Sequence, residues 1–296
     1  MHVERAPRPE RFRGGVAELA GRGLGSVPPP LLVIAGTVSV QVGSALARQL
    51  FAVTGALGAV SLRLGFAAVL LLAVWRPSLR LSRRAWTVVI GYGLVLAGMN
   101  VCFYEGIARV PLGLAVTIEF LGPLTVALLG SRRWLDAGWA LLAAGGVVLL
   151  TEGSGAISWL GVLFILGSAT LWGCYILLGA KLGEHTAGGS GLALAMTIGG
   201  LATAPLGITA GGANLLHPMA LAAGLGVALL SSVVPYSVEL EALRRMPPKV
   251  FGVLMSLEPA VAALAGLLVL GQVLHPAQWA AIGLVVAASA GATRFG

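Results

Sequence analysis

Long apolar runs of similar length recur along the whole chain and limit its possible folds more than any other feature. A helix needs about 20 mostly apolar residues to cross a bilayer. Of the 296 residues, 57% are hydrophobic and 10% are charged, whereas a soluble domain carries about 25% charge. The sequence therefore excludes an ordinary soluble enzyme and predicts an all-α polytopic membrane protein with ten transmembrane helices. We place these at residues 31–51, 56–75, 86–108, 112–130, 134–151, 157–180, 190–210, 218–240, 250–270 and 276–293.

The basic residues lie mostly between the apolar runs, on one side of the predicted membrane. If the N-terminus is cytoplasmic, 16 of the 19 Lys and Arg residues fall in cytoplasmic segments. Cytoplasmic loops carry such an excess. We therefore expect a multi-pass protein of the cytoplasmic (inner) membrane, with residues 1–30 as a basic cytoplasmic tail and both termini in the cytoplasm. The net charge of +8 does not indicate a nucleic-acid partner, because the basic residues form no patch with interleaved aromatic residues.

Residues 105–130 resemble residues 241–266 when the sequence is shifted by 136 positions. The matches of charged residues and prolines are Glu105 with Glu241, Arg109 with Arg245, Pro111 with Pro247, and Pro123 with Pro259. Each half of the chain then holds five helices, and because five is odd the second half enters the membrane in the opposite sense. The sequence predicts two inverted repeats, residues 31–153 and 154–296. Many secondary carriers place their site between such halves; a duplication without transport is the alternative.

Two glutamates lie deep within apolar runs, with no basic residue within one helical turn. Ionisable residues inside the membrane are costly, so each is a candidate functional group. Glu119 precedes Pro123 by four residues, and Glu258 directly precedes Pro259. A proline kinks a helix and frees a backbone carbonyl one turn earlier, and a carboxylate beside such a kink can bind an ammonium group or carry a proton. The alternative is a protonated carboxyl group bonded to a neighbouring helix.

Further polar residues lie inside the predicted helices. Pro235 frees the carbonyl of Ser231, and Glu239 lies three residues after Tyr236, on the same helix face. Arg63 is the one basic residue well inside a run, where it can face a substrate carboxylate or pair with an acidic side chain. The remaining candidates are amide, hydroxyl and aromatic side chains at Gln41, Asn100, Tyr104, Trp172, Tyr175 and Ser256. For the aromatic members, simple packing is the alternative.

Other acidic residues and the histidines give no sign of catalysis. Glu105 and Glu241 each precede an Arg by four residues, which predicts a structural ion pair on one helix face. The four histidines lie in the tail or in loops, at His2, His185, His217 and His275. The sequence holds no zinc-protease pair, phosphate loop or nucleophile elbow. We therefore expect no metal, no cofactor and no enzymatic activity.

Five stretches of the sequence resemble a known family. They are GMNVCFY at 98–104, VPLG at 110–113, EFLGP at 119–123, PYSVE at 235–239 and MSLEPA at 255–260. In these motifs the chain is similar to the threonine/homoserine exporters of bacterial inner membranes, a branch of the EamA-type carriers of the drug/metabolite transporter superfamily. The resemblance implies a ten-helix carrier with two five-helix halves that exports small amino acids in exchange for protons. Relatives commonly have Gly-Glu where this chain has Gly271-Gln272.

We therefore expect an inner-membrane secondary transporter that exports threonine, homoserine or a similar small amino acid by proton antiport. The substrate ammonium is expected at Glu119 or Glu258. Its carboxylate is expected at Arg63 or at the donors Asn100, Tyr104, Tyr236 and Ser256. Two alternatives stay open: an exporter of drugs, purines or other metabolites with the same fold, and a non-transporting membrane sensor or partner protein. Besides the substrate, protons and the lipid bilayer, a second copy of the chain is a candidate partner, in a homodimer.

Overall fold

Helices make up all the regular structure of the described residues in the computed structural model. The described residues are 26–129, 138–139, 141–142, 145–146, 158–186, 189–246 and 248–295. Helices that are long and apolar enough to cross a membrane span Pro29–Trp75, Arg83–Ile107, Trp159–His185, Ser190–Leu216 and Pro218–Tyr236. Shorter apolar helices span Leu112–Val126, Glu258–Leu270 and Pro276–Ala288. These lengths and this composition are those of a polytopic membrane protein.

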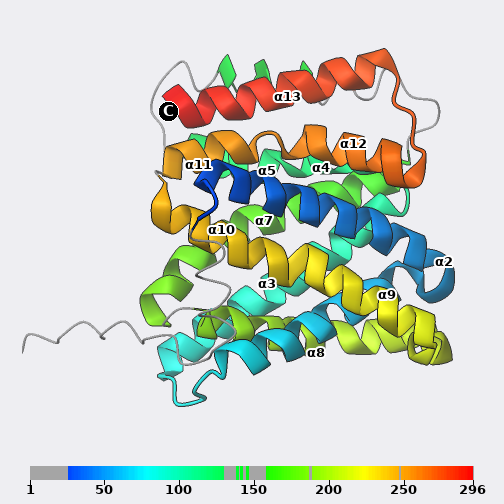
Figure 1. Ribbon diagram of the computed structural model, residues 1–296, viewed down its shortest axis with the longest axis vertical. Coiled ribbons are helices and arrows are strands. Elements are labelled where there is room, and N and C mark those ends of the chain that lie inside the picture. Colours follow the sequence, from blue (N-terminus) through cyan, green and yellow to red (C-terminus); the bar gives the residue numbers. More distant parts are fainter. Residues whose placement is uncertain are drawn as a thin grey trace, which may run out of the picture.

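The helices follow the predicted apolar runs on both sides of residues 134–151 (Figure 1). Most of that fifth run lies outside the described residues, so the count of ten transmembrane helices stays a prediction. The helices are α2 (Pro29–Trp75), α3 (Arg83–Ile107), α4 (Leu112–Glu119), α5 (Leu121–Leu129), α7 (Trp159–His185), α8 (Ser190–Gly211), α9 (Pro218–Ala228), α10 (Val234–Arg245), α11 (Pro248–Met255), α12 (Glu258–Leu270) and α13 (Pro276–Phe295). A 3₁₀ turn, η1, covers Gly212–Leu216, and a π-helical turn, η2, covers Leu229–Val233.

A bend at Gly55 divides α2 into the two helices that the first and second apolar runs predict. Gly55 has φ 70° and ψ 169°, a conformation that glycine adopts readily and residues with a Cβ do not. The chain turns back at this residue, so the two parts of α2 run in opposite directions (Figure 1). This bend brings the second part, which carries Arg63, beside the helices of the C-terminal half.

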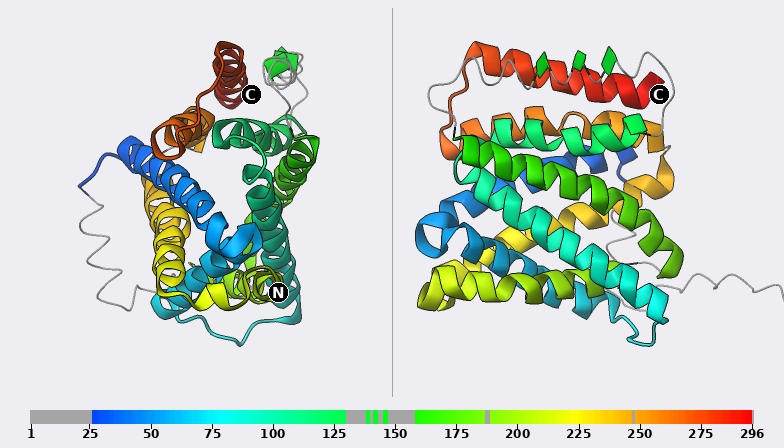
Figure 2. Two further views of the ribbon diagram at one scale, coloured as in Figure 1. Left: turned by 90° about the vertical axis from the view of Figure 1, so that its right-hand side faces the viewer. Right: turned by 180° about the vertical axis from the view of Figure 1, so that it is seen from behind.

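Long and short helices together form a closed ring around the centre of the molecule. Helix α2 packs against α8, α9, α10 and α12, and α3 packs against α8 and α7. Helix α7 packs against α4 and α5, and α4 packs against α12, which closes the ring. In the view along the helices, α3 and α7 lie opposite α2, α9 and α10 (Figure 2, left). Apolar side chains such as Leu64, Leu96 and Ile165 fill the contacts between neighbouring helices.

Two helices are interrupted at corresponding places. Helix α4 ends at Glu119 and α5 begins at Leu121, while α11 ends at Met255 and α12 begins at Glu258. Helix α11 begins and ends 136 residues after α4, which is the offset of the sequence repeat. The interruptions follow from Pro123 and Pro259, which cannot donate a backbone hydrogen bond. Each interruption therefore places a glutamate where a helix changes direction inside the ring.

Helix α13 lies at the edge of the ring, beside the described residues between 138 and 146 (Figures 1 and 2). Helix α13 and these residues are in close contact. A Cβ on Gly291 would lie 2.5 Å from the Trp139 ring, and one on Gly146 would lie 3.0 Å from the Val285 side chain. Small residues allow membrane helices to approach in this way. The pair is peripheral, so the centre of the molecule is formed by the other helices.

Candidate functional site

A cavity of about 380 Å³ lies inside the ring of helices. Its wall is built from α2, α3, α4, α5, α7, η2, α10, α11 and α12. The predicted residues that line it are Gln41, Arg63, Asn100, Glu119, Pro123, Trp172, Tyr175, Pro235, Tyr236, Glu239 and Glu258. Tyr104, Ser256 and Pro259 are buried and are not among its lining residues. The structure thus gathers, around one space, polar side chains from both halves of the chain.

Arg63 is buried and hydrogen-bonded to neutral oxygen atoms. Its Nη2 donates to the Ser231 carbonyl oxygen at 2.9 Å, and its Nη1 donates to the Tyr104 hydroxyl at 3.3 Å. Its Nε lies 3.4 Å from Ser232 Oγ, and the guanidinium carbon lies 5.6 Å from the centre of the Tyr104 ring. The Ser231 carbonyl precedes Pro235 by four residues, and a proline has no N–H to offer it. The guanidinium of Arg63 therefore donates to the Ser231 carbonyl in place of the N–H that Pro235 lacks.

Glu258 and Gln41 form a buried pair across α12 and α2. Gln41 Nε2 donates to Glu258 Oε1 at 2.9 Å, and the two residues are 1% and 7% exposed, respectively. Within the described residues, Glu258 Oε2 and Gln41 Oε1 are buried and have no hydrogen-bond partner. A buried polar atom without a partner costs free energy. These two oxygen atoms are therefore suited to accept hydrogen bonds from a ligand.

Glu119, the last residue of α4, meets a serine that the sequence analysis did not select. Ser168 of α7 is fully buried, and its Oγ lies within hydrogen-bonding distance of Glu119 Oε1. The same Oγ lies 3.0 Å from the Met99 carbonyl oxygen of α3. A signal for Ser168 exists in the sequence: it precedes Trp172 by four residues and Tyr175 by seven, which puts the three on one helix face.

Aromatic side chains form one side of the cavity. The Phe120 and Trp172 rings meet edge to face with their centres 5.5 Å apart, an arrangement that aromatic pairs favour. The Tyr175 ring lies 4.6 Å from the Tyr92 ring, and its hydroxyl interacts with that of Tyr236. Packing accounts for the positions of these rings, and those of Phe120, Trp172, Tyr175 and Tyr236 also line the cavity.

Two other predicted residues line the cavity in different ways. Asn100 Nδ2 donates to the Leu96 carbonyl oxygen of its own helix at 2.9 Å, so this amide hydrogen is used locally. Glu239 of α10 lies against α2, where a Cβ on Gly36 would come within 3.4 Å of its Cγ. The glycine thus leaves room for the acidic side chain between the two helices, and Glu239 adds a third carboxyl group to the cavity wall.

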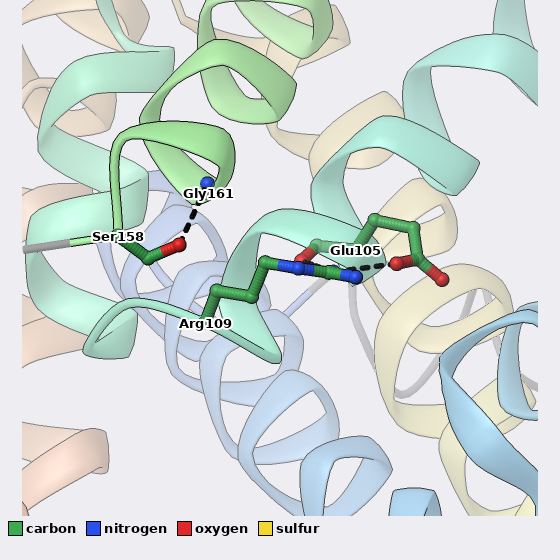
Figure 3. A network of polar contacts seen from close by, with 4 residues as sticks. All are labelled: Glu105, Arg109, Ser158 and Gly161. Atoms are coloured by element: carbon green, nitrogen blue, oxygen red, sulfur yellow. Dashed lines mark hydrogen bonds and ion pairs between the residues drawn. The ribbon is translucent and has the colours of Figure 1, made fainter.

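The other acidic residues singled out from the sequence lie away from the cavity. Glu105 forms an ion pair with Arg109 at the end of α3, beside the start of α7, where the Gly161 N–H donates to Ser158 Oγ (Figure 3). Arg245 Nη1 lies 3.9 Å from a carboxylate oxygen of Glu241. Both are the ion pairs expected from the four-residue spacing. Among the described residues, no group of His, Cys, Asp and Glu could hold a metal ion.

Gln272 forms a hydrogen bond between the two halves of the chain. Its Oε1 accepts a hydrogen bond from the Leu112 N–H at 3.0 Å, at the N-terminus of α4. Gly271 ends α12 with φ 65°, which turns the next residue toward α4. The bond satisfies one of the N–H groups that the start of every helix leaves free.

Comparison with known proteins places this chain in a family. The family model described as the EamA-like transporter family matches residues 159–294. The chain is 40% identical over 270 residues to the threonine/homoserine exporter RhtA of Escherichia coli (strain K12), covering 90% of this chain and 91% of that protein. It shows the same identity and coverage with RhtA of Salmonella typhimurium (strain SL1344).

A more distant relative and a solved structure agree with this placement. The uncharacterized transporter YwfM of Bacillus subtilis (strain 168) is 25% identical over 244 residues, which are 78% of this chain and 81% of that protein. A crystal structure at 19% identity has a TM-score of 0.57 and covers 89% of this chain and 96% of the solved chain, which shows a shared fold. The relatives are named as transporters and not as enzymes. The chain therefore belongs to the EamA-like transporter family and is a multi-pass membrane transporter.

Proposed function

We propose that this protein exports threonine, homoserine or another small amino acid across the inner membrane by proton antiport. The names of the exporters to which it is 40% identical support the substrate class. The observation that carries the proposal is the charge of the cavity wall, where one guanidinium faces three carboxyl groups, those of Glu119, Glu239 and Glu258. A zwitterionic amino acid needs a cation to bind its carboxylate and a carboxylate to bind its ammonium group. The volume of about 380 Å³ is within the range typical of small-molecule sites.

Arg63 binds the substrate carboxylate in this proposal. Its hydrogen bonds to Ser231, Tyr104 and Ser232 all go to neutral oxygen atoms. Charge-assisted bonds between a guanidinium and a carboxylate are about twice as strong as neutral ones and are often bidentate. A substrate carboxylate can therefore replace these neutral partners, and when the substrate leaves, they keep the buried cation satisfied.

Two inverted halves, residues 31–153 and 154–296, make up the carrier in this proposal, with ten transmembrane helices and both termini in the cytoplasm. The equal offset of α4 and α11 supports this arrangement. In that topology the cavity lining reaches Phe251, in the first turn of α11 on the cytoplasmic side. On the opposite side, the Gln272 bond to Leu112 ties α12 to α4. Loading from the cytoplasm is the first step that an exporter requires.

Transport by purified protein in proteoliposomes tests the proposal. Vesicles loaded with threonine should take up labelled threonine by counterflow, and an acidic exterior should speed threonine efflux because inward proton flow drives it. Lipid vesicles without protein are the control. Counterflow no greater than that control would reject transport of amino acids and leave the sensor alternative. Counterflow with purines or amphipathic drugs, and none with threonine or homoserine, would select the other transport alternative. Counterflow of threonine together with an efflux rate that does not respond to the pH gradient would reject proton antiport but not amino-acid transport.

A further inference from the structure

Ser168 lies between two oxygen atoms but has one hydrogen to donate. Its Oγ is 3.0 Å from the Met99 carbonyl oxygen and also bonds to Glu119 Oε1. A hydroxyl group donates one hydrogen bond and accepts others. Both contacts are hydrogen bonds at once when Glu119 is protonated and donates to Ser168, which then donates to Met99. If Glu119 is ionised, Ser168 must turn its hydrogen toward the carboxylate, and the bond to Met99 is lost.

Glu258 has the opposite kind of partner. Gln41 Nε2 is a donor only. It donates to Glu258 Oε1 and so favours the ionised carboxylate. The second carboxylate oxygen of Glu258 and the amide oxygen of Gln41 are buried and without a partner among the described residues. Ser231 also lines the cavity, and its buried Oγ, which can accept as well as donate a hydrogen bond, has no partner among the described residues. These are acceptors, and an ammonium group offers three donors and no acceptor.

From these contacts we propose a division of roles between the two carboxyl groups, which rests on the proposed function and deepens it. Glu119 carries the exchanged proton, and Glu258 with Gln41 binds the ammonium group of the substrate. Ser168 is a positioning residue that links the protonation of Glu119 to the contact between α7 and α3 at Met99. The proton leaves the Glu119 carboxyl group for water in the cavity, and the Ser168 hydrogen then turns toward the new carboxylate.

The charges around the two carboxyl groups couple their roles. Glu119 interacts electrostatically with Arg63 on α2, Cys102 on α3 and Glu258 on α12, and Glu258 also interacts with Glu239 on α10. An ammonium group at Glu258 adds a positive charge to this cluster. A positive charge nearby favours the ionised form of a carboxyl group, so arrival of the substrate promotes release of the proton. With this coupling, substrate and proton can be exchanged without competing for the same carboxylate.

Two transport measurements in proteoliposomes separate the roles. Threonine–threonine exchange at equal pH requires the ammonium site, whereas efflux driven by a pH gradient also requires the proton site. We expect Glu258→Gln to lower exchange at least tenfold. Glu119→Gln should keep exchange that no longer varies with pH, and it should abolish the acceleration of efflux by an acidic exterior. Glu105→Gln, whose carboxylate pairs with Arg109 outside the cavity, is the matched control and should resemble the wild type in both measurements.

Variants of Ser168 test the positioning role. Ser168→Ala should shift the pH dependence of gradient-driven efflux, because the protonated form of Glu119 loses its acceptor. Ser168→Thr keeps a hydroxyl group and should restore the wild-type pH profile. Equal pH profiles for the alanine variant and the wild type would overturn this role. A packing defect alone would lower the rate at every pH without moving the profile.

The ammonium site can also be tested in the wild-type protein. The analogue 2,3-dihydroxybutyrate replaces the ammonium group of threonine with a hydroxyl group, and we expect it to compete with threonine at least tenfold more weakly than homoserine does. Equal competition would overturn the ammonium site without any variant that must fold. Loss of exchange in Glu119→Gln together with full exchange in Glu258→Gln would reverse the assignment, and equal behaviour of the two would remove it. No exchange by the wild type would reject the proposed function instead.

Discussion

Gly122→Ala tests the closest approach between α5 and α7. A Cβ at this position would lie 2.1 Å from the Ala169 carbonyl oxygen and 2.9 Å from its carbonyl carbon. Close contacts between carbon and carbonyl oxygen are normally about 3.3–3.6 Å, so the two helices must separate by about 1 Å. Ala169 follows Ser168 directly in the chain. The same displacement therefore draws Ser168 away from Glu119.

Two opposing terms set the size of the effect. Overpacking a close contact costs about 1–3 kcal/mol, whereas Gly to Ala in a helix gains about 1 kcal/mol from propensity. Gly91 on α3 supplies the matched control, since a Cβ there would meet no atom within 4 Å. We expect Gly91→Ala to be neutral or stabilising by up to about 1 kcal/mol. Gly122→Ala should then be less stable than Gly91→Ala by about 1–3 kcal/mol.

Thermal unfolding of the purified variants in one detergent measures this difference, and gradient-driven threonine efflux measures the displacement of Ser168. The expected result is a lower unfolding midpoint for Gly122→Ala than for Gly91→Ala, together with weaker acceleration of efflux by an acidic exterior. A Gly122→Ala protein as stable as Gly91→Ala, with unaltered coupling to pH, would refute the close contact and the argument built on it.

Three further experiments test the role of the Arg63 guanidinium, the hydrogen bond between Gln272 and Leu112, and the net charge that one transport cycle moves. Arg63→Lys keeps the positive charge but loses the planar fork, so threonine counterflow at low substrate concentration should fall at least tenfold; an unchanged rate would exclude the guanidinium as carboxylate site. Gln272→Ala removes the acceptor for the Leu112 N–H and should lower the free energy of unfolding by about 1 kcal/mol, while Gln272→Glu, which keeps an oxygen there, should not. Exchange of one proton for one zwitterion moves net charge, so an inside-negative potassium diffusion potential should speed threonine efflux from proteoliposomes, and no response would contradict that ratio.

The helices and their breaks could be predicted because local physics determines them. Apolar runs of about 20 residues become helices in a bilayer, and a proline removes the hydrogen bond that would continue a helix. The interruption between α4 and α5 lies beside Pro123, and the one between α11 and α12 lies beside Pro259. The residues around these prolines were therefore good candidates for a polar centre. The transmembrane helix expected at residues 134–151, most of which lie outside the described part of the chain, stays a prediction.

The partners of the polar residues could not be predicted, because they depend on contacts between helices far apart in the sequence. From the sequence, Arg63 could face a substrate carboxylate or pair with an acidic side chain. In the structure its donors go to Ser231, Ser232 and Tyr104. Ser168 was overlooked for the same reason: its spacing from Trp172 and Tyr175 places it on their helix face, but nothing in the sequence indicates which groups it contacts. Its importance comes from Glu119 and Met99, which lie on other helices.

The choice of partners for Arg63 determines how the cavity can respond to cations. A guanidinium bonded directly to one of the glutamates would form a buried ion pair and leave that carboxylate satisfied. Here the guanidinium is bonded to neutral oxygen atoms, so one cation stands among three carboxyl groups that it cannot neutralise together. Unpaired charges in a low-dielectric space are costly. The excess of carboxyl groups over cations therefore favours binding of protons or ammonium groups. A cavity that binds either of these at neighbouring carboxyl groups has the property that exchange of substrate for protons requires.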